Sequence, residues 1–274
     1  MAESTTPAVA KPHPTNHFSV RGTLDPRMDA LVGLSGIGVL VLIWCFLTYG
    51  HLIKPFFLPS PLQIWQGLQD FDQRHWLLPA IWNSVCRVTF SLLIVTLIGG
   101  PIGLLMGSLP AADAFLRKIV NGAKSVPTTG IIGLIVLWFS IEERAKIVFL
   151  VLGSIFYMII LVKNAIQNVN EDYLRVALDI GATRWQTLWR VQLPAAWPQI
   201  WDAIAVCNGI MWTYIVLAEF INSNESQLGL GYLLYIGSRT QESGKVFAAL
   251  IIIALISSLT DWVMQGIRGR FFNW

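Results

Sequence analysis

Residues 175–194 read RVALDIGATRWQTLWRVQLP, a polar, glycine-broken segment between hydrophobic stretches of membrane-spanning length. Ala177 and Leu178 share a face with Gly181 at helical spacing, which predicts a short helix ahead of the glycine. Gly181 lies where a helix commonly closes with a left-handed residue. The segment is therefore expected to form a helix-turn-helix outside the lipid, and an ordinary connector between two spans is the alternative.

A second helix is expected directly after this turn. Thr183 and Gln186 have the spacing of a capping box, in which each side chain accepts a backbone N–H of the other residue. Trp185 and Leu188 then give the helix an apolar face, and Pro194 is expected to end it. With its flanks, the loop covers residues 166–199.

The composition is that of a membrane protein. Hydrophobic residues make up 54% of the 274 positions, charged residues only 13%, and the mean hydropathy is +0.59, which is far from what the surface of a water-soluble enzyme requires. A helix needs about 20 apolar residues to cross about 30 Å of hydrocarbon. The fold is therefore predicted to be all-α and polytopic, with about six transmembrane helices. The candidate stretches are Ala30–Tyr49, Val88–Ser108, Gly130–Ile141, Ala145–Ala165, Ile200–Ile221 and Val246–Ile267.

The third stretch, Gly130–Ile141, is shorter than the others. Pro127, Gly130 and Gly133 lie in it or just before it, and both residue types weaken a helix. Together with its upstream residues, this stretch is expected to be short, kinked or partly non-helical. Irregular backbone at membrane depth needs cover from protein or from a water-filled cavity, which predicts a position beside a pathway.

Basic residues predict the orientation. With the amino terminus in the cytoplasm, twelve Lys and Arg residues fall in cytoplasmic segments and seven in external ones, and positive residues favour the cytoplasmic side. Both termini and the 166–199 loop are therefore expected in the cytoplasm. Residues 1–28 are predicted to be a disordered tail ahead of a membrane domain over 29–274. The inside set is Lys11, Arg21, Arg27, Arg117, Lys118, Lys124, Lys163, Arg175, Arg184, Arg190, Arg268 and Arg270; the outside set is Lys54, Arg74, Arg87, Arg144, Lys146, Arg239 and Lys245.

Catalytic and metal-binding patterns are not found in the sequence. Cys45, Cys86 and Cys207 are scattered and odd in number, and the four histidines show no ligand spacing. A phosphate loop of the GxxxxGK[ST] type is not found either. The chain is therefore predicted to be neither an enzyme nor a nucleic-acid-binding protein, and any ATP that drives it must be hydrolysed by another chain.

Glycines recur at every fourth position in the second stretch, at Gly99, Gly103 and Gly107. Small residues at this spacing let two membrane helices approach closely. We therefore expect helix contacts there, and not a phosphate cradle.

The loop also matches a known family pattern, which requires a glycine, nine residues, an aliphatic residue, any residue, Leu and Pro. Gly181 is followed by nine residues and then by Val191-Gln192-Leu193-Pro194. It resembles the "EAA" loop by which permease subunits of bacterial ABC importers dock their ATPase. Arg175 and Val176 stand where that loop has its acidic residue and first alanine, and only Ala177 is kept.

Further motifs extend the resemblance over about residues 55–274. In order and rough spacing they are similar to permeases for taurine, alkanesulfonate, nitrate and bicarbonate. Gly133 and Ser140 depart from the second proline and the glycine that these permeases commonly have in the third span. The matching motifs are Val126-Pro127, Leu137-Trp138-Phe139, Leu217-Ala218-Glu219 and Leu228-Gly229-Leu230-Gly231.

The resemblance implies a type I ABC importer permease in the bacterial inner membrane. The implied partners are a second permease copy, two cytoplasmic ATPases that carry the ATP and Mg, and an external binding protein that delivers a small anionic or zwitterionic solute; no cofactor is implied for this chain. The ATPase-coupling residues are predicted to be Ala177, Leu178, Gly181, Ala182, Thr183, Arg184, Trp185 and Leu188.

Polar and aromatic residues at membrane depth are candidates for the translocation path, because such groups are costly in lipid and commonly functional. Glu219 and Asp261 lie towards span ends, so solvation or an ion pair is their alternative role. A secondary transporter or channel without an ATPase is the alternative function, and it predicts inverted repeats or buried coupling charges; a membrane-embedded enzyme ranks third. The candidate path residues are Trp138, Tyr157, Asn208, Trp212 and Glu219.

Overall fold

The computed structural model describes residues 25–140, 142–221 and 227–271, and every regular element within them is a helix. Five of these helices are long and apolar enough to cross a membrane, or six if one bent pair counts as a single span. This confirms the all-α, polytopic prediction. In chain order the elements are α1 (Pro26–Tyr49), α2 (Pro61–Gln73), α3 (Leu77–Ser108), α4 (Pro110–Lys124), η1 (Thr128–Ile131), α5 (Ile132–Phe139), α6 (Glu143–Gln167), α7 (Glu171–Asp179), α8 (Arg184–Thr187), η2 (Leu188–Gln192), α9 (Leu193–Ile221), α10 (Leu230–Arg239) and α11 (Ser243–Phe271).

The chain divides into two compact units, residues 1–60 and 61–274. In the first unit, α1 is a membrane-spanning helix whose large apolar side chains are exposed along most of its length. The indole N–H of Trp44 donates to the carbonyl of Pro59 at 3.0 Å, which ties the following segment back to the helix. The predicted first span is confirmed, whereas residues 1–24 of the expected tail lie outside the described residues.

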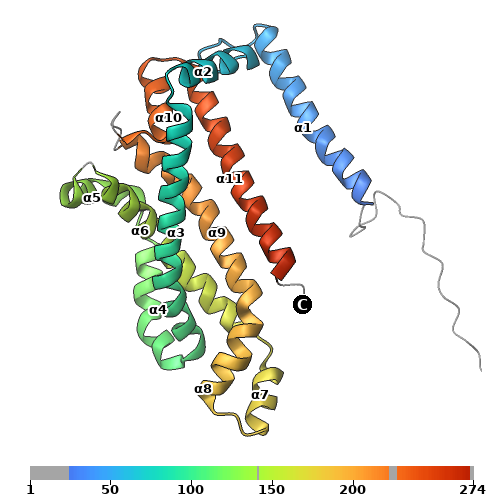
Figure 1. Cartoon of the computed structure of the whole chain (residues 1–274), viewed down its shortest axis with the longest axis vertical. Coiled ribbons are helices and arrows are strands. Elements are labelled where there is room, and N and C mark those ends of the chain that lie inside the picture. The colour runs from blue at the N-terminus through green and yellow to red at the C-terminus, as the bar shows by residue number, and fades with distance from the viewer. Residues whose placement is uncertain (1–24, 141, 222–226, 272–274) are drawn as a thin grey trace, which may run out of the picture. The chain divides into compact units, whose positions relative to one another are not determined.

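Four long helices, α3, α6, α9 and α11, form the centre of the second unit (Figure 1). α3 and α6 run parallel, because Arg87 lies beside the start of α6 and Gly107 lies beside Ile166 near its end. α9 runs in the opposite direction, since its late residue Glu219 returns to Arg87. One end of the bundle therefore holds Arg87 and Glu219, and the other holds Gly107 and Ile166.

The predicted glycine contacts join α3 to α6. A Cβ built on Gly103 would lie 2.6 Å from the carbonyl oxygen of Ile159, and one on Gly107 would lie 2.7 Å from the Cβ of Ile166. Real Cβ atoms do not approach so closely, so only glycine permits this helix separation. The close-packing prediction for the glycine series is confirmed.

The third span is broken, as its prolines and glycines predict. α4 and the η1–α5 segment form a bent pair with an angle of 79°. Pro127 lacks an N–H and restricts the residue before it, so the α-helix ends ahead of it. The span therefore begins at α4, upstream of the predicted Gly130–Ile141 core. Lys163 of α6 holds the first turn of α4 through an ion pair with Asp113 at 2.6 Å.

α2 lies on α11 at the end of the unit that also carries α10 (Figure 1). Glycine again sets the approach, because a Cβ on Gly244 would lie 2.6 Å from the carbonyl oxygen of Gln63. Next to this crossing, Lys245 pairs with Asp70 at 2.9 Å. The hydrogen bond from Lys245 lowers the pKa of the Asp70 carboxyl below its ordinary value. The pair therefore holds α2 against α11 while Asp70 is ionised.

Candidate functional site

The turn of the EAA-like loop, residues 166–199, has the backbone geometry that its sequence predicts. Gly181 has φ +88°. Its N–H donates to the carbonyl of Leu178 at 2.9 Å, and the N–H of Ala182 donates to the carbonyl of Ala177 at 3.0 Å. These two bonds around a left-handed residue form a Schellman motif. The predicted helix-closing role of Gly181 is confirmed.

The capping box after the turn is also present. The hydroxyl oxygen of Thr183 accepts the N–H of Gln186 at 3.2 Å, and the Gln186 side-chain oxygen accepts the N–H of Thr183 at 2.9 Å. Arg184, between them, is exposed. The two local motifs shape the turn between α7 and α8.

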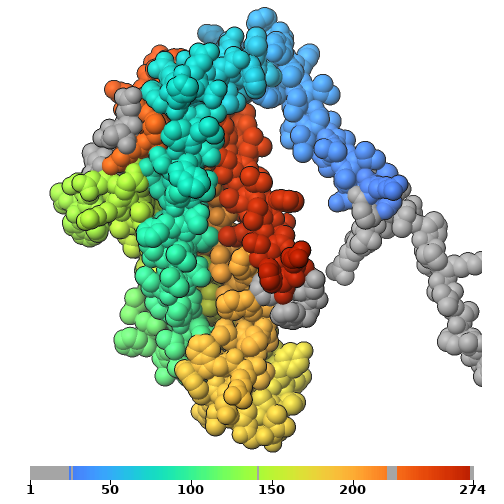
Figure 2. Space-filling model, in the orientation of Figure 1, coloured from blue at the N-terminus to red at the C-terminus, as the bar shows by residue number. Residues whose placement is uncertain are grey.

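Apolar side chains of the loop divide into a buried and an exposed set. Ala177 and Leu188 are buried against the chain itself, so they hold the loop together. Leu178 and Trp185 are exposed. The loop projects at one end of the space-filling view (Figure 2). Five further exposed apolar residues of the loop were not among the predicted coupling residues: Tyr173, Val176, Ile180, Trp189 and Trp197.

The helix after the turn does not end at Pro194, as the sequence pattern predicted. α8 continues through the π-helical turn η2 into α9, and Pro194 is the second residue of α9. Proline normally clashes with the carbonyl four residues earlier, but a π-turn widens the helix at that level. The prediction of a stop was wrong because it did not allow for this wider turn. α8, η2 and α9 therefore form one continuous stretch, Arg184–Phe220.

A buried ion pair lies at the opposite end of the bundle. Glu219 is 1% exposed, and its carboxylate accepts from Nη1 of Arg87 at 2.7 Å. It also accepts the hydroxyl of Ser84 at 2.8 Å and the backbone N–H of Gly231 at 2.8 Å. A Cβ on Gly229 would lie 2.4 Å from this carboxyl group. The Leu228–Gly231 motif therefore packs directly against the pair. Glu219 is ion-paired, and its part in the translocation path stays a prediction.

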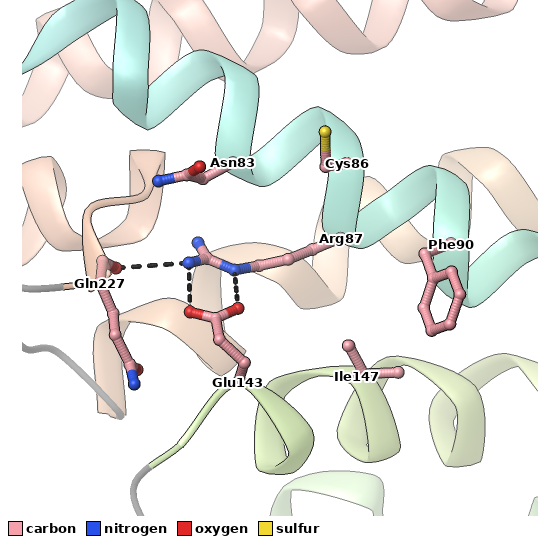
Figure 3. Close-up of a pocket in the computed structure, with 7 residues that line it drawn as sticks. All are labelled: Asn83, Cys86, Arg87, Phe90, Glu143, Ile147 and Gln227. Carbon is pink, nitrogen blue, oxygen red and sulfur yellow. Dashed lines mark hydrogen bonds and ion pairs between the residues drawn. The ribbon is translucent and has the colours of Figure 1, made fainter.

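The remaining edge of Arg87 faces Glu143. Nε and Nη2 of the guanidinium donate to the two carboxylate oxygens at 2.6 and 2.5 Å (Figure 3). Lys146, one turn further along α6, adds a third contact from Nζ to the same carboxylate at 3.2 Å. In contrast to Arg87, Glu143 is 43% exposed. This half of the cluster is therefore open to solvent.

An open pocket of about 540 Å³ leads to this exposed half. The volume lies within the range of about 300–1,000 Å³ that is usual for small-molecule sites. Figure 3 shows the Arg87–Glu143 pair within the set of lining residues. The pocket is lined by Asn83, Cys86, Arg87, Phe90, Glu143, Ile147 and Gln227.

The five predicted path residues do not gather in one place in the single chain. Trp138 on α5 and Tyr157 on α6 lie at the surface. Asn208 is buried and donates to the side chains of Thr260 and Asp261 in α11. Trp212 is also buried in the bundle, and Glu219 is enclosed in the ion pair described above.

Sequence reasoning missed Arg87 and Lys146 as site residues and counted them among external loop charges. Both are buried in helices, Arg87 in α3 and Lys146 in α6. Arg87 pairs with Glu143 and Glu219, which are both more than 50 positions away in the sequence. Spacing along the chain does not reveal contacts between residues so far apart. Two signals were available in the sequence: each residue lies next to a long apolar run, and Lys146 follows Glu143 by three residues, the spacing of a helical ion pair.

The sequence profile described as "Binding-protein-dependent transport system inner membrane component" matches residues 99–273. The chain is 28% identical over 248 residues to the taurine transport system permease protein TauC of Escherichia coli, which covers 89% of each chain. It is also 28% identical over 248 residues to the putative aliphatic sulfonates transport permease protein SsuC of Bacillus subtilis, which covers 90% of this chain and 89% of that one.

A solved structure shares the fold. A chain of the bacterial alginate ABC transporter in complex with an alginate pentasaccharide-bound periplasmic protein matches with a TM-score of 0.58 and 17% identity. The match covers 89% of this chain and 96% of that one. The fold of the described helices is therefore that of an ABC importer permease.

Proposed function

Because this chain belongs to the binding-protein-dependent transport system inner membrane component family, as an ABC importer permease of the taurine, sulfonate, nitrate and bicarbonate type, we propose that it forms the translocation path for a small anionic or zwitterionic solute. Its driving force comes from a separate cytoplasmic ATPase, which holds the ATP and Mg. The permease itself performs no covalent chemistry.

The exposed apolar surface of the EAA-like loop is the observation that carries the coupling role. A projecting polar loop gains nothing from exposing Ile180 and Trp185 to water, because burying each would be favourable by about 1.5–3 kcal/mol. Trp185 and Trp189 contact each other edge to face, with ring centroids 5.5 Å apart. Such aromatic pairs are typical anchors at protein interfaces. The ATPase would bury this surface.

The continuous stretch from α8 to α9 gives the loop a mechanical role. At about 1.5 Å per residue, its 37 residues extend about 55 Å, from Trp185 at one end to Glu219 near the other. Gln192 of η2 also donates to the carbonyl of Ile166, which ties α9 to the end of α6. ATP-driven closure of the ATPases would therefore move α9 and α6 together, and would shift the permease between two rigid arrangements.

The proposed assembly contains two copies of this permease, two ATPases and an external binding protein. The loop and both termini face the cytoplasm in this assembly, and the Glu219 end faces outward. The exposed rings of Trp138 and Tyr157 line the path between the two copies. The buried Asn208 and Trp212 position α9 behind it.

The proposal is tested by co-purification of the ATPase and by solute uptake. Trp185→Ala removes an exposed indole, and Gly181→Asp adds a side chain at a positive φ, which costs about 1–2 kcal/mol. Both variants should lose the ATPase and uptake while the spans still fold. Trp262→Ala, on α11, is the matched control, because that ring is 71% exposed and Trp185 is 65% exposed.

Normal uptake and a bound ATPase in both loop variants would show that the loop is only a connector. Uptake that persists without any ATPase would favour a secondary transporter or channel. Equal loss in Trp262→Ala would mean that the effect is a general one on folding.

A further inference from the structure

We propose that the Arg87–Glu143 pair is a binding site for a small oxyanion of the carboxylate or sulfonate class, in which the Glu143 carboxylate occupies the site until the solute displaces it. The inference rests on the proposed transport function for the identity of the oxyanion as solute.

The two carboxylates that share Arg87 are held very differently. Glu219 is enclosed, and its oxygens are satisfied by Arg87, Ser84 and the backbone of Gly231. Among the described residues, the donors to Glu143 are the side chains of Arg87 and Lys146, and Glu143 is 43% exposed. Glu219 therefore acts as a fixed counter-ion of the cluster, and Glu143 is the one that can leave.

Departure of Glu143 would leave a built anion site. Nε and Nη2 of Arg87 already present two parallel donors to a planar pair of oxygens, and Nζ of Lys146 adds a third. Arg87 and Lys146 carry two positive charges, and Glu219 carries one negative charge. The cluster would therefore hold a net charge of +1 among buried side chains, which is costly unless an anion replaces the carboxylate.

The position of Glu143 would allow its side chain to move away from Arg87. It is the first residue of α6, so its backbone lies at a helix end, and its side chain borders the pocket of about 540 Å³. Carboxylates and sulfonates present oxygens at nearly the spacing that the guanidinium fork recognises. A solute oxyanion entering the pocket would thus take the place of a chemically equivalent group, with no change of net charge in the cluster.

The native Cys86 reports on this pocket, because it is exposed and lines it next to Arg87. The experiment uses the purified full-length chain with its co-expressed partners, in a Cys45→Ser background; Cys207 is buried and out of reach. Cys86 is labelled with two methanethiosulfonates, one bearing a sulfonate and one bearing a trimethylammonium group. The ratio of their rates cancels changes in thiol reactivity and in general access.

Glu143→Gln should raise the ratio of anionic to cationic labelling several-fold, since removing a negative charge that lines the same pocket as Cys86 acts in opposite senses on the two reagents. Methanesulfonate should then slow labelling more than sodium chloride at equal ionic strength. Glu142→Gln is the matched control, because Glu142 is the exposed preceding residue. Glu143→Asp keeps the charge and should restore a ratio close to that of wild type.

The proposal is overturned if Glu143→Gln and Glu142→Gln give the same ratio, if methanesulfonate and chloride protect equally, or if Cys86 reacts with neither reagent. Labelling does not require transport. A failure of the proposed function would therefore appear in uptake and ATPase binding, and a failure of the anion site would appear here.

Discussion

Gly103→Ala tests whether the close α3–α6 contact sets the stability of the bundle. The added Cβ would lie 2.6 Å from the carbonyl oxygen of Ile159 and 2.8 Å from the Cβ of Val162. Non-bonded heavy atoms settle at about 3.5–4.0 Å, so the helices would have to separate by about 1 Å. Gly100→Ala, one turn away in the same helix, is the matched control, because no heavy atom lies within 4 Å of its Cβ position.

The difference between these two variants isolates the cost of overpacking. Both gain up to about 1 kcal/mol of helix propensity over glycine, but only Gly103→Ala pays about 1–3 kcal/mol of overpacking. For a protein of about this size, 1 kcal/mol shifts the melting temperature by about 2–4 °C. Gly103→Ala should therefore melt about 2–12 °C below Gly100→Ala in detergent, as followed by tryptophan fluorescence. Equal melting temperatures would refute the argument that glycine is required at this contact.

Two further substitutions test the charged contacts. Gly229→Ala would place a Cβ 2.4 Å from the Glu219 carboxyl and 2.6 Å from Nη1 of Arg87. Breaking a buried ion pair costs about 3–5 kcal/mol, so the variant should melt well below wild type. A wild-type melting temperature would contradict the close packing of Gly229 against the ion pair. Asp70→Asn removes a carboxylate whose pKa the hydrogen bond from Lys245 lowers below 3.8. A lowered folded-state pKa stabilises the protein above the unfolded value, and the gain is lost as the pH falls through the folded value. The stability advantage of wild type over Asp70→Asn should therefore grow as the pH rises from below about 4 to above it. Parallel melting profiles of the two proteins across that range would exclude the effect.

Local backbone chemistry was the part of the fold that the sequence predicted best. The closing role of Gly181 and the Thr183–Gln186 capping box each depend on residues a few positions apart, so spacing alone was enough to locate them. The glycine series of α3 was also readable, since a small residue every fourth position has few other uses in an apolar helix. The break at Pro127 follows from proline's own geometry.

The charged cluster could not be predicted in the same way. Arg87 and Lys146 looked like loop charges because each lies near the end of an apolar stretch. Arg87 finds its partners on two other helices, Glu143 on α6 and Glu219 on α9, whereas Lys146 pairs with Glu143 on its own helix. Three members of the predicted external set, Arg87, Lys146 and Lys245, are buried helix residues and not loop charges.

The π-turn η2 joins α8, next to the Gly181 turn, to α9, which carries Glu219. Before it, the capping box and Gly181 shape the turn between α7 and α8. After η2, α9 runs on to Glu219, which pairs with Arg87 of α3. A regular α-helix would meet Pro194 with a clash and kink, and the direction of the upper part would then depend on the kink. The wider turn accommodates Pro194 within one continuous helical stretch, Arg184–Phe220, as the proposed coupling between the loop and the spans requires.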